Sequence, residues 1–152
     1  MEKTIEKLKS DKHYYGKFGK QFLSNSDIYD LLHNPKEFQQ PKEANVNFEF
    51  GKAFHEMIMF GTVPTYVEAS SRRTNIYKNA CADNKVDMML LDSEVEELTN
   101  AVAKAKDNEF VAKLLARADL SFEVPNVAEL TDNKIQWKCK ADIVTNDWLY
   151  DI

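Results

Sequence analysis

The chain has 152 residues and a formal net charge of −5, and 43% of its residues are hydrophobic and 30% charged. This balance is typical of a soluble globular protein long enough to bury a core, so we expect one domain over residues 1–152. No apolar run reaches the roughly 18 residues of a membrane span and no signal peptide begins the chain, which predicts a cytoplasmic protein without a membrane partner.

The first part of the chain predicts helices separated by loops. Residues 1–12 are mostly charged, as in a short or frayed helix, and the aromatic segment after them is broken by glycines. We expect residues 1–20 to form a peripheral segment. Ser24 and its polar neighbours offer N-caps for a helix that Pro35 ends.

Residues 48–60 predict a largely buried helix, because apolar side chains surround almost its whole circumference. Gly61 marks its end. His55 is one of the few polar exceptions, and Gly51 lies one turn before it on the same side. A glycine there lets a ligand or another backbone come close. His55 is therefore a candidate ligand, and the alternative is a core histidine bonded to a carbonyl.

The middle of the chain predicts further helices. We expect a short strand or loop near residues 66–69 and a helix near residues 76–84. The sequence Ser-x-x-Glu that begins at Ser93 is a capping box, which predicts the start of another helix. Residues 107–108 interrupt that helix, and a further helix covers residues 109–118.

The last part of the chain predicts a three-stranded antiparallel meander, and with it an α+β fold. The first strand covers residues 121–130 with an interruption at Pro125 and Asn126. A turn at residues 131–133 leads to the second strand, residues 134–144, and the third covers residues 148–152.

The register of the hairpin between the last two strands follows from counting residues outward from its turn. Asn146 and Asp147 tolerate the positive φ angles of a tight two-residue turn, and such a turn places Asp142 opposite Asp151. Alternation then defines an expected core face, which carries Trp137, Cys139, Ala141, Ile143, Trp148, Tyr150 and Ile152. The other face carries Lys138, Lys140, Asp142 and Asp151, with Val144 and Leu149 near the turn.

Two facing carboxylates are unfavourable unless something separates their charges, and a divalent cation with oxygen ligands does so. The alternative is a solvated outer face in a shifted register. The acidic total argues against a protein that coats nucleic acid, but it permits a nuclease with a local basic groove. Candidate groove residues are Arg72, Arg73, Lys78, Lys138 and Lys140. Each is alternatively an ordinary solvated charge.

Taken in order, these motifs resemble the PD-(D/E)XK nuclease superfamily. The motifs are Ser-Asn-Ser at 24–26, Asn-Pro-Lys-Glu-Phe at 34–38, Phe-Gly-Lys-Ala-Phe-His-Glu-Met-Ile-Met at 50–59, Lys-Ala-Asp at 140–142 and Leu-Tyr-Asp-Ile at 149–152. The resemblance is greatest to the RecE-type phage exonucleases (exodeoxyribonuclease VIII-like) within the RecB-like group. It implies a restriction-endonuclease-like core, made of the buried helix and the meander, with additional N-terminal and middle helices.

The resemblance implies a role for each matching residue. His55 matches a helix histidine that is a metal ligand in RecB-like nucleases. Asp142 matches the first strand aspartate, and Asp151 matches the aspartate of the Asp-x-Lys signature. The main-chain carbonyl of Ile152 completes the metal site, and Glu123 matches a strand glutamate of some members. The implied cofactor is Mg²⁺ or Mn²⁺, which polarises the phosphate and activates a bound water.

The implied function is a phage-encoded DNA exonuclease of recombination or DNA degradation, acting in the host cytoplasm, with DNA contacts at Arg72, Arg73, Lys138 and Lys140. In the family a lysine follows the position of Ile152 and the core continues. We therefore expect a truncated, split or inactive nuclease that needs a complementing C-terminal segment, a homo-oligomer or a host protein. The alternative is a non-catalytic binding protein or inhibitor acting on a host nuclease or defence complex. A third possibility is an α+β domain without a site.

Overall fold

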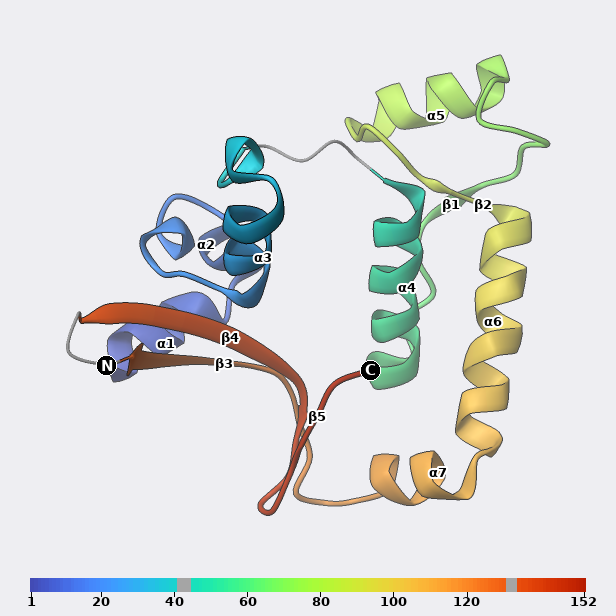
Figure 1. Cartoon of the computed structure of the whole chain (residues 1–152). Helices are drawn as coiled ribbons and strands as arrows, with labels where there is room; N and C mark the ends of the chain where they lie inside the picture. The colour runs from blue at the N-terminus through green and yellow to red at the C-terminus, as the bar shows by residue number, and fades with distance from the viewer. Residues whose placement is uncertain (41–44, 131–133) are drawn as a thin grey trace. The chain divides into compact units, whose positions relative to one another are not determined.

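The computed structural model shows an α+β protein, as the sequence predicted, with helices and a three-stranded antiparallel sheet (Figure 1). It describes residues 1–40, 45–130 and 134–152. The predicted turn at residues 131–133 lies outside the described residues. None of the described helices is long and apolar enough to cross a membrane.

The chain divides into two compact units, and each has a hydrophobic cluster of its own. The first unit combines Met1–Lys42 with Asp119–Ile152, and the second unit is Glu43–Ala118. The first unit therefore joins the N-terminal segment to the C-terminal sheet. Whether the two units fold as one domain, as the length suggests, stays a prediction.

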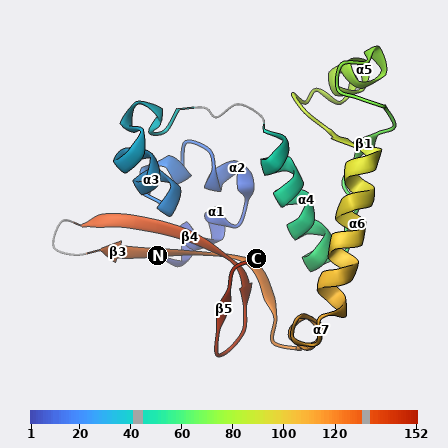
Figure 2. The same cartoon turned by 45° about the vertical axis from the view of Figure 1, so that its right-hand side comes forward.

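The sheet of the first unit is the predicted meander (Figure 2). Its strands, in the spatial order β3-β4-β5, are β3 (Ser121–Leu130), β4 (Ile135–Val144) and β5 (Leu149–Tyr150). The predicted interruption of the first strand is wrong, because β3 is continuous and Pro125 pairs opposite Lys140. Proline lacks an N–H for the ladder, but β3 is an edge strand, where proline is tolerated.

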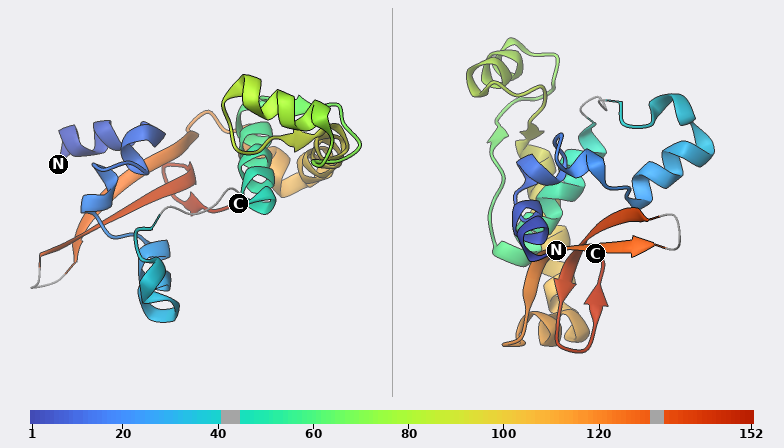
Figure 3. Two further views of the ribbon diagram at one scale, coloured as in Figure 1. Left: turned by 90° about the horizontal axis from the view of Figure 1, so that it is seen from above. Right: turned by 90° about the vertical axis from the view of Figure 1, so that its left-hand side faces the viewer.

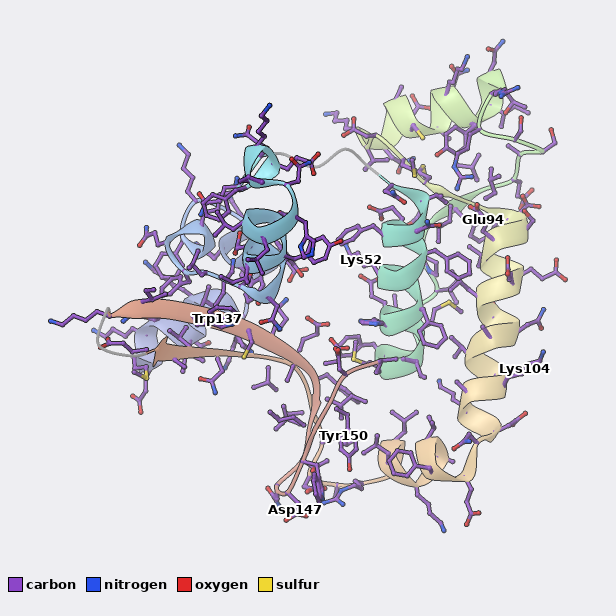
Figure 4. All side chains as sticks on the ribbon, in the orientation of Figure 1. Lys52, Glu94, Lys104, Trp137, Asp147 and Tyr150 are labelled. Atoms are coloured by element: carbon purple, nitrogen blue, oxygen red, sulfur yellow. The ribbon has the colours of Figure 1, made fainter. Side chains whose placement is uncertain are left out.

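The β4–β5 hairpin has the register obtained by counting across a two-residue loop, which confirms that prediction. The backbone of the turn differs from the expectation, because neither Asn146 nor Asp147 has a positive φ angle. Thr145 closes the turn instead. Its N–H donates to the carbonyl of Trp148 at 2.9 Å, and its hydroxyl accepts the N–H of Trp148 at 3.0 Å. Figure 4 shows Asp147 at the tip of this hairpin.

Helix α1 packs on strand β3, and Figure 3 shows the N-terminal segment in blue against the strands. The elements of this segment are α1 (Glu2–Leu8), α2 (Asp11–Tyr14), the 3-10 helix η1 (Gly19–Gln21), α3 (Asn25–His33) and the 3-10 helix η2 (Pro35–Glu37). Residues 1–20, expected at the periphery, contribute Leu8 and Tyr14 to a buried cluster with Phe22 and Val127. Leu8 is 0% exposed, so this segment belongs to the core of the unit.

The N-terminal segment covers the charged face of β4, which corrects the expected assignment of the core face. Lys138 is 6% exposed and Asp142 is also buried, whereas Cys139, expected in the core, is exposed. Val127 lies opposite Lys138 on β3 and belongs to the buried cluster. Ile143, near the hairpin, is buried as expected. The apolar cover of the charged face thus comes from residues far away in the sequence.

The second unit consists of helices and two short parallel strands. Its elements are α4 (Val46–Phe60), β1 (Tyr66–Val67), α5 (Asn75–Asn84), β2 (Leu90–Leu91), α6 (Asp92–Asp107) and α7 (Glu109–Leu115). Helices α4 and α6 lie side by side (Figure 1). The core cluster of this unit consists of Val67, Tyr77, Cys81, Met89 and Leu91. The predicted helices at residues 48–60, 76–84 and 109–118 are confirmed, with small differences at their ends.

Local capping sets three helix ends, of which the sequence predicted the caps at Ser24 and Gly61 and an interruption at residues 107–108. Helix α3 begins after Ser24, whose N–H donates to the carboxylate of Asp27 at 2.8 Å. Helix α4 ends at Gly61, which adopts the left-handed conformation with φ 68°. Helix α7 begins after Asn108, whose side-chain oxygen accepts the N–H of Phe110 at 3.0 Å.

Helix α6 begins before the predicted capping box at Ser93, so that prediction is wrong. The N–H of Leu91 donates to Oε2 of Glu94 at 2.8 Å, which caps the first turn. Leu91 is also the last residue of β2, which pairs with β1. The strand pairing, a tertiary interaction, therefore sets the start of the helix. Figure 4 shows Glu94 at this end of α6 and Lys104 toward the other.

Candidate metal site

Two carboxylates of the first unit face each other across neighbouring strands. The register of β3 and β4 sets Phe122 opposite Ile143 and Val124 opposite Ala141, so Glu123 lies opposite Asp142. An oxygen of the Glu123 carboxylate lies within 4.8 Å of an oxygen of the Asp142 carboxylate. The sheet thus brings together two of the residues that the sequence singled out.

Glu123 has a strained backbone. Its φ angle is 53°, in the left-handed region that residues with a side chain seldom adopt. Such a conformation costs on the order of 1–3 kcal/mol and persists only where the surrounding structure holds it, often at functional sites. The strain lies within a strand, at the residue whose carboxylate faces Asp142. This carboxylate also forms an ion pair, 3.0 Å from Nζ of Lys140.

Asp142 is buried, and its carboxylate receives a main-chain hydrogen bond. Oδ2 of Asp142 accepts the N–H of Ile152 at 2.9 Å, so the residues after β5 continue beside β4. Asp151, predicted to share a cation with Asp142, follows β5 and is exposed. The pairing of β3 with β4 brings the Glu123 carboxylate to Asp142. The predicted roles of Asp151 and of the Ile152 carbonyl stay predictions.

Lys140 lies between two carboxylates beside this pair. Its side chain is 8% exposed, and Nζ is 2.6 Å from Oδ1 of Asp11 and 3.0 Å from Oε2 of Glu123. Nζ also lies 4.9 Å from the ring centre of Tyr14 and 5.5 Å from that of Tyr15. Burial by itself would lower the pKa of Lys140, but the hydrogen bonds to Asp11 and Glu123 outweigh it and raise the pKa. The ammonium is therefore held in its charged form.

Lys138, predicted to contact DNA, is directed into the protein. Its Nζ donates to the carbonyl of Tyr14 at 2.7 Å and lies 4.4 Å from the centre of the Tyr14 ring. Burial lowers the pKa of Lys138. Lys138 is 6% exposed, and the Lys140 side chain is 8% exposed. The structure therefore argues against the predicted DNA contacts at these two lysines.

Arg72, also predicted to contact DNA, is engaged in the second unit. Its Nη2 donates to both oxygens of Glu94, at 2.8 and 2.6 Å, and its guanidinium lies 5.9 Å from the ring centre of Tyr77. The hydrogen bond that Arg72 donates to Glu94 raises the pKa of Arg72. This pair braces the start of α6. Arg73, the fourth predicted contact, is exposed.

His55 lies on α4 in the second unit. Lys52 and Glu56 share this helix, with Nζ of Lys52 3.9 Å from Oε1 of Glu56. A Cβ built at Gly51 would meet no protein atom within 4 Å, so no other backbone comes close there, and the approach of a ligand stays a prediction. A larger side chain would therefore fit at position 51, and steric crowding does not account for the glycine. The predicted role of His55 as a ligand rests on the sequence resemblance.

Comparisons with protein-family models, with curated proteins and with solved structures give no match to this chain. The chemistry of the residues therefore carries the assignment. Two carboxylates on one covered face suit a hard divalent cation, since Mg²⁺ is usually held by one or two carboxylates together with waters. Glu123 and Asp142 fit that description.

The sequence resemblance gave Glu123 only an assisting role, and the local pattern did not reveal its larger one. Counting across the turn predicted at residues 131–133 pairs Glu123 with Ala141, one residue away from Asp142, its partner in the structure. Asp11 was missed altogether. It reaches Lys140 from 129 residues away, and no local pattern marks such a contact.

Proposed function

We propose that this chain is a metal-dependent, nuclease-like protein of the PD-(D/E)XK superfamily, related to RecE-type phage exonucleases. The observation that supports this most is the Glu123–Asp142 pair, two carboxylates opposed on adjacent strands with oxygens within 4.8 Å. Helix α4 and strands β3, β4 and β5 would be the helix and the meander of the family core. The strained backbone of Glu123 is a second support, because strain of this kind gathers at functional sites.

In this proposal Glu123 and Asp142 hold Mg²⁺ or Mn²⁺. His55 adds an imidazole, and Asp151 and the carbonyl of Ile152 add oxygen ligands, as the sequence resemblance implies. The bound cation would supply Lewis-acid polarisation of a DNA phosphate and a water of lowered pKa. The N–H of Ile152 orients the Asp142 carboxylate by donating to Oδ2.

The proposal is tested by a Mn²⁺ titration of the purified chain in a calorimeter, followed by digestion of end-labelled linear DNA. We expect Asp142→Asn and Glu123→Gln each to weaken Mn²⁺ binding by about a hundredfold or more, since each removes a charged ligand. Glu129→Gln is the matched control, because Glu129 is an exposed acid on the same strand. If Glu129→Gln weakens binding as much as Asp142→Asn does, or if the unaltered chain binds no Mn²⁺, the proposal fails.

A second candidate function is a nuclease-derived protein that binds a host protein without catalysis. The observation in its favour is the hairpin, where Trp148 and Leu149 are exposed large apolar residues. This function predicts a complex that Asp142→Asn leaves intact and that Trp148→Ala disrupts. Pull-down by the unaltered chain and by both variants distinguishes it from the metal-dependent function.

A further inference from the structure

The ammonium of Lys140 forms an ion pair with the Glu123 carboxylate, which the proposed metal site also uses as a ligand. Its Nζ lies 3.0 Å from Oε2 of Glu123, and Glu123 is one half of the carboxylate pair with Asp142. The Lys140 side chain is 8% exposed, and the rings of Tyr14 and Tyr15 flank Nζ. Burial and the two flanking rings therefore restrict the positions that the ammonium can adopt. A divalent cation on Glu123 and Asp142 would compete with it for the same oxygen atoms.

Asp11 offers the ammonium a second partner. Oδ1 of Asp11 is 2.6 Å from Nζ, closer than Glu123, and the Asp11 side chain is 62% exposed on the first turn of α2. A buried ammonium that lost its only partner would carry a large desolvation penalty. Because Asp11 remains, Lys140 can give up Glu123 without becoming an unpaired buried charge. Lysine suits this exchange, since it is a compact charge with rotatable donors on a flexible stem.

We propose that Lys140 is an internal counter-ion of the metal site, which holds Glu123 in the absence of a divalent cation and transfers to Asp11 when the cation binds. This rests on the proposed function. Lys140 is thus a positioning residue that balances the carboxylate pair, and Asp11 is the acceptor that makes its displacement possible. The N-terminal segment thereby sets the affinity of a site whose ligands lie on the sheet.

The proposal predicts effects of opposite sign at two residues that touch each other. Lys140→Met removes the competing cation, so Mn²⁺ affinity rises by about tenfold, the usual size of a coupling within one ion-pair network. Asp11→Asn removes the alternative acceptor, so Lys140 stays on Glu123 and Mn²⁺ affinity falls by a similar factor. A merely structural role for the Asp11–Lys140 pair would lower affinity in both variants.

The experiment is a calorimetric Mn²⁺ titration of the full chain and its variants, with urea unfolding in the absence of metal as a second readout. Lys140→Arg keeps the competing positive charge, so it does not show the rise in Mn²⁺ affinity expected for Lys140→Met. Lys113→Met is the control for loss of one positive charge, because Lys113 forms an exposed pair with Glu109 in the other unit. Glu129→Gln is the control for loss of one negative charge. Both controls leave affinity unchanged.

The outcomes separate the two proposals. If the unaltered chain binds no Mn²⁺, the proposed function fails and the counter-ion role fails with it. If the unaltered chain binds Mn²⁺ and Asp142→Asn abolishes binding, but Lys140→Met and Asp11→Asn both lower affinity or both leave it unchanged, only the counter-ion role is overturned. If Lys140→Met does not fold, Asp11→Asn decides, because Asp11 is exposed and its substitution spares the core.

Discussion

Replacing Leu8 by alanine tests whether the N-terminal segment is part of the core of the first unit. Leu8 is 0% exposed and packs with Tyr14, Phe22 and Val127. Truncating a buried leucine to alanine costs about 2–5 kcal/mol, because transfer energy is lost and a cavity remains. We expect a loss near 3 kcal/mol, which is a large part of the roughly 5–15 kcal/mol that holds a domain together.

The measurement is urea unfolding followed by circular dichroism and by tryptophan fluorescence. With an m-value of about 1.5–2 kcal/mol per molar urea, a loss of this size lowers the midpoint by roughly 1.5–2 M. Leu32→Ala is the matched control: Leu32 is 74% exposed, and its truncation changes stability by no more than about 0.5 kcal/mol. A Leu8→Ala midpoint equal to that of Leu32→Ala would refute the packing of the N-terminal helices on the sheet.

Two further predictions concern the covered face of the sheet. Glu123→Gly relieves the left-handed strain at φ 53°, so the free energy of unfolding in the absence of metal rises by up to about 1 kcal/mol while Mn²⁺ binding is lost; a fall in stability on urea unfolding would contradict the strain argument. Burial raises the pKa of Tyr14, so the folded state keeps the phenol neutral while the unfolded state ionises near its ordinary pKa of about 10. The contribution of the neutral Tyr14 phenol to the free energy of unfolding is therefore present below that pH and is lost as the pH rises above it. Tyr14→Phe cannot ionise, and unfolding midpoints measured from pH 8 to 11 should fall less steeply for this variant; identical slopes would contradict the assignment.

Interactions between residues close in sequence were predictable. Ser24, Gly61 and Asn108 set helix ends through capping, which joins groups within about four residues of each other. The hairpin register followed from one short loop, and the pairing of Ile143 with Tyr150 agrees with it. His55 was identifiable as a candidate ligand because it is polar within an apolar helix, and Asp142 because the hairpin register places it opposite Asp151. Both candidate ligands can thus be named from the sequence alone.

The face of the sheet that is covered was not predictable in this way. Alternation along β4 separates the side chains into two sets, but it does not say which set the rest of the chain will cover. The charges of Lys138 and Lys140 suggested a face in water. The fold instead places Tyr14 over them, and the carbonyl of Tyr14 accepts from Lys138 across 124 residues of sequence.

The sequence by itself determined the helices, the antiparallel meander, the hairpin register and the acidic residues worth testing, because these depend on periodicity, capping and short turns. Only the tertiary structure decided that Glu123 on β3 is brought to Asp142, and that Asp11 holds Lys140 beside them. The physical reason is the separation in sequence. The charges at this site belong to groups on different elements, and only folding brings those elements together.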